Sequence, residues 1–429
     1  MKLGKRRYAA AAAGLAALLA FTTGCGSAGP GSKSGGVNAW VLTGAYEPAF
    51  RASFSSGNID GQFFGNDAYK QKIRSAVGAD QAPTLIFSWG NGGMLKSWVD
   101  GGKIYDLSAD VQANPKMTSR YLPSVMKAGQ IDGKTYALPN NSVQPVMLFY
   151  NKDLFNQLNV QPPKTWDDLI ALIPKFNAAN IAPLTLGGQS KWSYLMYMEY
   201  LVDRIGGPEV FNAVTANKPN AWSDPAFIRA GQMIQQLVDA KGFVNGFKSI
   251  TTDSNADTAL LYTNRAAMYL MGSWAFPTIK QANPQFAQSK LGWTAFPTVP
   301  GGKGDPADIA GNPANFWSVS AKATDDQKKA AVKYLSDNVM NDANVDSLVS
   351  LGAVPPVNGI QDKLAKAKDP DFLTYTYNMA ANAPNFQMSW DQALSPGQAD
   401  ALLTNLDQLF GKQITPEQFA ANMNATIGK

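Results

Sequence analysis

The chain has 429 residues, 37 Lys and Arg against 32 Asp and Glu, a single Cys and no His. This composition excludes a Ser/His/Asp or Cys/His nucleophile and a zinc site built on imidazole or thiolate ligands. No metal and no cofactor is therefore expected. Chemistry that needs only carboxylates, such as glycoside hydrolysis, stays open.

The first 24 residues are predicted to be an export signal. Four cations, from Lys2 to Arg7, precede an apolar stretch that runs from about Ala9 to Phe21 and is too short to span a bilayer. The small residues that end at Gly24, directly before Cys25, resemble the lipobox of bacterial lipoproteins. That resemblance implies removal of residues 1–24 and acylation of Cys25. The alternative is an ordinary signal peptide with a cysteine near its cleavage site.

Removal of the signal changes the charge of the chain. Without its four cations, 33 Lys and Arg face 32 Asp and Glu, so no basic surface for nucleic acid is expected. Residues 25–36 are rich in Gly and Ser and are predicted to form a flexible tether. The remaining length is too great for one core and indicates two domains.

The first elements of the mature chain indicate an α/β sheet. Val37–Leu42 has the pattern of a strand, apolar residues recur at helical spacing from Asp67, which is a candidate N-cap, and Thr84–Phe87 is a short buried strand. Ligands of such sheets bind at the carboxyl ends of the strands. The loops Gly44–Glu47 and Ser88–Asn91, which follow two strands, are therefore placed at a candidate cleft.

Farther along, Pro145–Tyr150 is another predicted strand. Thr165–Asp168 and Thr324–Gln327 have the pattern of capping boxes, each at the start of an amphipathic helix. Pro174 is expected to bend or end the first of these helices. Trp166 is interpreted as a packing residue of the same helix.

Four of the ten tryptophans stand beside short polar residues instead of aliphatic ones. This setting suits an indole that stacks on an apolar ligand face while its neighbours hydrogen-bond the rim, and a pyranose ring has that character. The alternative is that they are core or surface aromatics in turns. The four are Trp89, Trp192, Trp274 and Trp390.

Several segments in a fixed order carry a family resemblance. They are Ala82–Phe87 with the following Trp-Gly, Gly133–Pro139 leading into Leu148–Asp153, Pro163–Leu169, and Ala266–Trp274. Together they resemble the family 1 extracellular solute-binding proteins of ABC sugar importers, and within that family the binders of xylobiose and related oligosaccharides. The match covers essentially the whole mature chain.

The resemblance implies a type II periplasmic-binding-protein-like fold, in which two α/β lobes with mixed sheets and flanking helices close about a hinge. The crossings between lobes are expected near Asn140–Pro145, Gly311–Asn315 and Val354–Asn358. Accordingly, residues 37–143 and 315–356 are assigned to the first lobe, and residues 144–314 and 357–429 to the second.

The function implied by the resemblance is that of a monomeric receptor, lipid-anchored through Cys25 on the extracellular face of the membrane. It would bind an oligosaccharide, with a xylo-oligosaccharide favoured, and deliver it to an ABC permease. Tryptophans would stack on the sugar, and amide, carboxylate and phenol groups would bind its hydroxyls. The expected ligand-binding residues are Tyr46, Glu47, Asn66, Asp67, Trp89, Asn91, Asn140, Asn141, Gln144, Trp192, Trp274, Asn312, Trp390 and Asp391.

Three alternatives stay open at this point. The first is a binding protein for another solute class, such as an amino acid, peptide, polyamine or metal, and the second is a sensory co-receptor of the same fold. The third is an anchored glycoside hydrolase, in which Glu47 would pair with Asp67 or Asp391.

Overall fold

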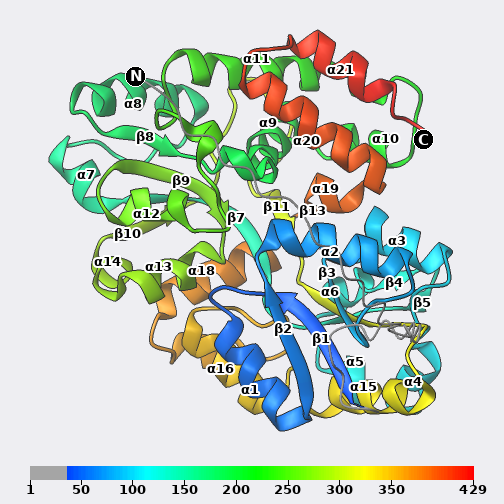
Figure 1. Ribbon diagram of the computed structural model, residues 1–429. Coiled ribbons are helices and arrows are strands. Elements are labelled where there is room, and N and C mark those ends of the chain that lie inside the picture. Colours follow the sequence, from blue (N-terminus) through cyan, green and yellow to red (C-terminus); the bar gives the residue numbers. More distant parts are fainter. Residues whose placement is uncertain (1–35) are drawn as a thin grey trace, which may run out of the picture.

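The computed structural model describes residues 36–429, which form two α/β lobes, one above the other in Figure 1. Each lobe is built around its own cluster of buried apolar side chains. Within residues 36–429, none of the helices has the length and apolar character needed to cross a membrane. Residues 1–35 lie outside the described part of the chain, and with them the predicted signal, Cys25 and nearly all of the tether.

The first lobe contains a five-stranded sheet in the order β2-β1-β3-β12-β6. Strands β1, β2 and β3 are parallel, whereas β12 runs antiparallel to β3 and β6. The sheet strands are β1 (Val37–Leu42), β2 (Ile59–Phe64), β3 (Leu85–Ser88), β6 (Leu138–Pro139) and β12 (Phe316–Val319), and a small ribbon adds β4 (Gln130–Ile131) and β5 (Lys134–Thr135). The helices of this lobe are α1 (Glu47–Gly57), α2 (Asn66–Gly78), α3 (Gly93–Asp100), α4 (Ser108–Ala113), α5 (Lys116–Ser119), α6 (Pro123–Lys127), α15 (Asp325–Asp337), α16 (Asp342–Leu351) and α17 (Gln361–Ala365).

The second lobe contains a six-stranded sheet in which β7 is central and antiparallel to β9, β10 and β11. Its strands are β7 (Gln144–Asn151), β8 (Ala182–Thr185), β9 (Ala266–Gly272), β10 (Leu291–Thr294), β11 (Ile309–Asn312) and β13 (Phe386–Met388). Its α-helices are α7 (Lys152–Gln157), α8 (Trp166–Ala178), α9 (Leu195–Gly206), α10 (Glu209–Thr215), α11 (Pro225–Asp239), α12 (Ala256–Tyr262), α13 (Ala275–Ala282), α14 (Pro284–Ser289), α19 (Trp390–Ala393), α20 (Pro396–Phe410) and α21 (Pro416–Asn424). Short 3-10 turns lie at η1 (Gly188–Ser190), η2 (Trp192–Tyr194), η3 (Ala221–Ser223) and η4 (Phe247–Ser249).

The chain passes between the lobes three times. The first passage separates Val143, in the core of the first lobe, from Val146, in the core of the second, and the next separates Ala310 from Ala314. The third passage is α18 (Pro370–Ala381), in which adjacent residues Phe372 and Leu373 are buried in different cores.

The third passage therefore comes later than the predicted Val354–Asn358. Val354 and Val357 are both buried in the first lobe. The carbonyl of Val354 accepts from Val143 N at 3.0 Å, and the carbonyl of Pro356 accepts from Leu122 N at 2.9 Å. The two prolines thus form a turn that is bonded into the first lobe, and the lobe's core extends to Leu364.

Local signals in the sequence mark several helix starts accurately. Capping boxes begin α8 at Thr165 and α15 at Thr324, as predicted. Trp166 is buried, in agreement with its interpretation as a packing residue. The predicted N-cap at Asp67 is wrong, because Gly65 is the N-cap of α2 and Asp67 lies in its first turn. Pro174 lies inside α8, which continues to Ala178.

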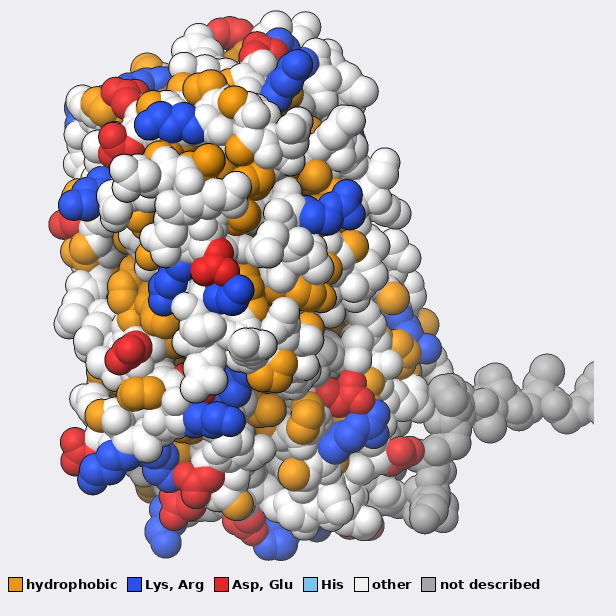
Figure 2. Space-filling model, turned by 90° about the vertical axis from the view of Figure 1, so that its left-hand side faces the viewer, with side chains coloured by type: hydrophobic (Ala, Val, Ile, Leu, Met, Phe, Trp, Pro, Cys, Tyr) orange, Lys and Arg blue, Asp and Glu red, His pale blue; other side chains and the backbone are white. Residues whose placement is uncertain are grey.

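The surface carries charges of both signs. On the face drawn in Figure 2, Lys and Arg side chains alternate with Asp and Glu side chains, and apolar side chains show between them. This mixture agrees with the near balance of charges in residues 25–429, in which 33 Lys and Arg face 32 Asp and Glu.

Candidate binding site between the lobes

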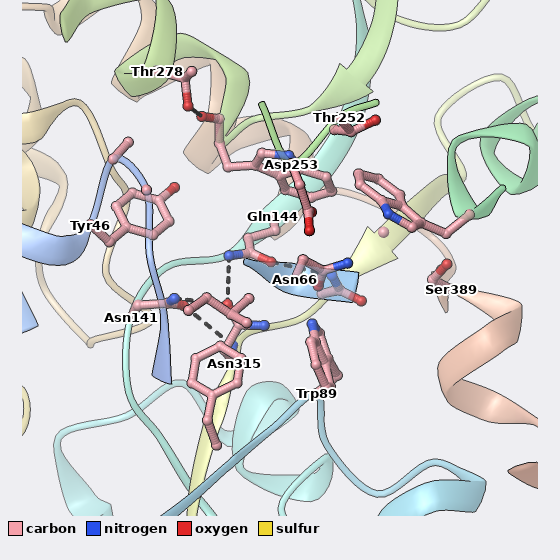
Figure 3. A pocket seen from close by; sticks show the side chains of 18 of the residues that line it. Tyr46, Asn66, Trp89, Asn141, Gln144, Thr252, Asp253, Thr278, Asn315 and Ser389 are labelled. Atoms are coloured by element: carbon pink, nitrogen blue, oxygen red, sulfur yellow. Dashed lines mark hydrogen bonds between the residues drawn. The ribbon is translucent and has the colours of Figure 1, made fainter. Parts of the chain in front are cut away.

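A cavity of about 380 Å³ lies between the two lobes. It is lined by aromatic side chains together with amide, hydroxyl and charged groups, many of which converge in Figure 3. The lining residues are Leu42, Thr43, Gly44, Ala45, Tyr46, Phe50, Gly65, Asn66, Lys70, Phe87, Trp89, Asn141, Gln144, Val146, Trp192, Met196, Thr252, Asp253, Asn255, Trp274, Thr278, Gly311, Asn312, Asn315, Ser389, Asp391 and Gln392.

The first lobe reaches the cavity through the carboxyl ends of its parallel strands. Gly44 and Tyr46 follow β1, and Trp89 follows β3, which pairs directly with β1. Because parallel neighbours end at the same edge of a sheet, two loops far apart in sequence meet there. The strand-end expectation thus locates the cleft.

Two tryptophans of the second lobe lie together at the cavity. The ring centroids of Trp192 and Trp274 are 6.2 Å apart, with an angle of 52° between the planes. Gly272 makes room for the second of them, because a Cβ at that position would lie 1.8 Å from the indole of Trp274. The Met-Gly-Ser-Trp segment therefore needs its glycine for packing.

A chain of amide side chains joins the two hinge segments. Asn141 Nδ2 and Gln144 Nε2 each donate to Asn315 Oδ1 at 2.7 Å. Asn312 Nδ2 donates to Gln144 Oε1 at 3.2 Å. Asn141 Oδ1 accepts from the backbone N of Ser142 and of Asn315, so the backbone sets the orientation of the first amide and, through it, of the others.

Two buried polar atoms of cavity residues have no hydrogen-bond partner within residues 36–429. They are Trp192 Nε1, a donor, and Asn312 Oδ1, an acceptor. An unmet buried polar group costs about 1–3 kcal/mol. A ligand group that reaches either atom would recover that free energy, so the site favours a ligand with both donors and acceptors.

Two aspartates of the second lobe that line the cavity are each bonded to a residue of the first lobe. Lys70 Nζ lies 2.7 Å from Asp391 Oδ2, and Asp253 Oδ2 accepts from Asp67 N at 3.1 Å. Burial, with the nearby Asp67 charge, raises the pKa of Asp253. Burial also raises the pKa of Tyr46 to about 12, so its phenol stays neutral. The hydrogen bond in which Ser142 Oγ donates to Tyr46 Oη at 3.1 Å acts in the opposite direction on this pKa. Residues 36–429 contain no cluster of three acidic, His or Cys side chains suited to a metal ion.

Nine of the predicted ligand-binding residues line the cavity. Tyr46, Asn66 and Trp89 come from the first lobe, Trp192, Trp274 and Asp391 from the second, and Asn141, Gln144 and Asn312 from the hinge.

Five predicted residues do not line it. Glu47 is turned toward Thr43 and Arg51, with which it forms hydrogen bonds of 2.6 and 2.7 Å. Asn91 is exposed and donates to the carbonyl of Lys127 at 3.2 Å, whereas Asn140 is buried away from the cavity.

Asp67 and Trp390 complete this group. Asp67 offers its backbone N–H to Asp253 but does not line the cavity. Trp390 is fully buried and stacks on Phe211 at 4.3 Å, so it belongs to the core of the second lobe and is no platform for a ligand. With Glu47 and Asp67 off the cavity, neither carboxylate pair considered for glycoside hydrolysis is assembled there.

The structure adds residues that the sequence did not single out. Among them are Lys70, Thr252, Asp253, Asn315 and Ser389. Lys70 follows Asp67 by one helical turn, and that spacing could have drawn attention to it. Asp253 lies in a loop before α12, where no sequence pattern marks its position.

Comparison with known proteins identifies the family. Residues 39–344 match the family of bacterial extracellular solute-binding proteins. The "Multiple sugar-binding protein" of Streptococcus mutans is 26% identical over 272 residues, which make up 62% of this chain and 61% of that protein. Across the first curated relatives, the match spans between 46% and 61% of the relative's length.

Solved structures match over more of the chain. A structure from work on xylan utilization by Caldanaerobius polysaccharolyticus has a TM-score of 0.80 and 28% identity, and the match covers 91% of this chain and 100% of that one. A chitin oligosaccharide binding protein shares the fold, with a TM-score of 0.78 and 22% identity over 91% of this chain and 98% of that one. The chain therefore belongs to the bacterial extracellular solute-binding proteins, which are binding proteins and not enzymes.

Proposed function

We propose that this protein is an extracellular receptor that captures a short neutral oligosaccharide between its lobes. The observation that carries the proposal is the pair Trp192 and Trp274 in a cavity whose other groups are mainly amides and hydroxyls. A sugar ring offers an apolar face to an indole and hydroxyls to the amides, each aromatic contact contributing about 0.5–1.5 kcal/mol. No cation of the lining is left for an anionic solute, because Lys70 already pairs with Asp391.

A xylo-oligosaccharide such as xylobiose is the favoured ligand. The similar structure from work on xylan utilization supports this choice, and the relative described as a multiple sugar-binding protein supports a sugar ligand in general. Small-molecule sites range over about 300–1,000 Å³. The cavity, at about 380 Å³, is near the lower end of that range and favours a ligand of few sugar units.

The same proposal includes the anchor and the partner. Acylation of Cys25 would hold a monomeric receptor on the extracellular face of the membrane, within reach of an ABC permease that takes up the sugar. Mass spectrometry of the native protein checks this part. An unmodified Cys25, or a mature chain that begins beyond it, would remove the anchor and leave sugar binding untouched.

Titration tests the binding proposal directly. Calorimetry with xylobiose, cellobiose, maltose and chitobiose should give saturable binding of at least one sugar, with xylobiose expected to bind tightest. Replacing Trp274 by Ala should then weaken binding by more than about tenfold, which is about 1.4 kcal/mol. Trp293→Ala is the matched control, because Trp293 is in the same lobe, packs on Phe276 and does not line the cavity. Equal effects of the two substitutions would remove Trp274 from the site.

A further inference from the structure

Helix α2 carries contacts to the second lobe along one face. Tyr69, Ile73 and Val77, on the adjoining face of the helix, are buried in the core of the first lobe. Asp67, Lys70 and Arg74 follow one another at helical spacing on the face turned to the second lobe. Each of the three meets an aspartate of the other lobe.

The three contacts differ in burial. Asp67 N donates to Asp253 Oδ2 at 3.1 Å, near the positive end of the helix dipole. Lys70 Nζ lies 2.7 Å from Asp391 Oδ2, and these side chains are only 17% and 6% exposed. Arg74 Nη1 reaches both carboxylate oxygens of Asp400 at 2.9 and 3.0 Å at a more exposed position. We call these three contacts the α2 latch.

The central contact of the latch also forms part of the cavity wall. Asp391 Oδ2 receives both Lys70 Nζ and Gln392 Nε2, the latter at 3.1 Å. No hydrogen bond to its Oδ1 is found within the described residues, and Asp391 and Lys70 both line the cavity. Lys70 also lies 5.2 Å from the ring centroid of Trp89, which limits where its ammonium can move.

We propose that the α2 latch holds the lobes together and that Lys70 is the positioning residue that turns Asp391 toward the ligand. The two side chains come from different lobes, so the pair exists only while the lobes meet. The lobes therefore populate the closed arrangement even without a sugar. The Asp391 carboxylate, the proposed acceptor for a sugar hydroxyl, is then already oriented when the sugar binds. The role of Asp391 as a sugar contact rests on the proposed function, whereas the latch does not.

The physical reason lies in the burial of the pair. A buried charge whose partner is removed is strongly unfavourable, whereas the same charge in an open cleft is solvated by water. Loss of Lys70 therefore penalises the closed arrangement specifically. Because apparent affinity scales with the population of the binding-competent state, that penalty weakens ligand binding.

Three variants test the proposal. Lys70→Met leaves Asp391 unpaired, and Lys70→Met with Asp391→Asn removes both charges. Lys72→Met is the matched control, because Lys72 lies on the same helix but faces the rings of Trp40 and Phe64 in the first lobe, at 4.7 and 4.9 Å. The measurements are the small-angle scattering radius of gyration without sugar and the calorimetric affinity for xylobiose, after thermal melts have shown that each variant is folded.

Lys70→Met should increase the radius of gyration and weaken xylobiose binding about tenfold or more, whereas Lys72→Met should change neither. The radius of gyration of the double variant should return toward the wild-type value, because no unpaired charge is left between the lobes. Its affinity for xylobiose should stay low, because Asp391→Asn replaces the charged carboxylate that accepts from the sugar by a neutral amide. Identical scattering for Lys70→Met and Lys72→Met would overturn the latch. If wild-type protein binds none of the sugars yet Lys70→Met expands it, the latch stands and the sugar proposal fails.

Discussion

At the residue scale, Glu199 in α9 is a buried residue that does not line the cavity but hydrogen-bonds a segment of its wall. Its Oε1 accepts from Trp390 N at 2.7 Å and from Ser389 Oγ at 2.9 Å. These hydrogen bonds fix the position of the segment whose residues Ser389 and Asp391 line the cavity. Burial raises the pKa of Glu199 from 4.5 to about 8, the nearby Asp391 adds to the rise, and the two hydrogen bonds oppose it.

This pKa makes stability depend on pH. Between pH 4.5 and about 8 the folded chain keeps a proton that the unfolded chain releases, so the free energy of unfolding falls as pH rises through that window. The contribution is on the order of a few kcal/mol. Glu199→Gln retains the accepting oxygen and should flatten the dependence in urea unfolding from about pH 5 to about pH 8. Glu209→Gln, at an exposed site on α10, serves as the control, and parallel curves for both variants would contradict the assignment.

Sequence predicts a side chain's chemistry better than its direction. Trp274 and Trp390 both follow a serine, and both look suited to a polar rim. Only Trp274 lines the cavity, because Trp390 stacks on Phe211, a residue about 180 positions away that no local pattern connects to it. The family resemblance predicts a cleft between two lobes, and a cavity lies there. Whether a given tryptophan lines that cavity or packs in a core depends on contacts distant in sequence.

At the element scale, the start of α3 meets α19 and the segment after it without room for a side chain. A Cβ on Gly92 would lie 1.8 Å from the carbonyl oxygen of Gln392, and a Cβ on Gly93 would lie 2.0 Å from that of Leu394. Gly92 has φ −68° and ψ −178°, which any residue can adopt. Its missing side chain therefore serves contact between the lobes and not backbone freedom.

Gly92→Ala should consequently hinder closure without disturbing the first lobe. We expect apparent affinity for xylobiose to fall about tenfold or more, with little change in thermal stability. Gly78→Ala, at the end of α2, is the matched control because a Cβ there meets nothing within 4 Å. Calorimetry decides the point, and unchanged affinity in Gly92→Ala would mean that the lobes can bind sugar without this close approach.

Elements with local signals are predicted well from sequence, and long-range connections are not. The capping boxes of α8 and α15 are determined by residues three positions apart, which a single sequence displays. The third passage between the lobes depends instead on Val354 and Val357 packing in the first lobe, and the Pro-Pro pair between them looks like a hinge in sequence.

At the scale of the whole molecule, the hinge joins the lobes through side-chain amides. Asn141, Gln144, Asn312 and Asn315 connect the first two passages. A sugar that contacts both lobes binds the closed arrangement better and shifts the population toward it. Small-angle scattering of the Lys70→Met variant, in which the central contact of the α2 latch is absent, should therefore show a more compact particle with saturating xylobiose. An unchanged profile of that variant, with a sugar that calorimetry shows to be bound, would count against hinge closure.

The three passages also constrain the order in which the chain can acquire structure. Strand β12 lies between β3 and β6, although about 180 residues separate it from β6 in sequence. The first lobe's sheet thus stays divided until Phe316–Val319 has been synthesised, and Leu373 joins that core later still. Such long-range pairing slows folding. A chain with the predicted export signal would gain from this delay, since its first lobe would stay incompletely folded, and so easier to pass through a membrane pore, until β12 has been synthesised.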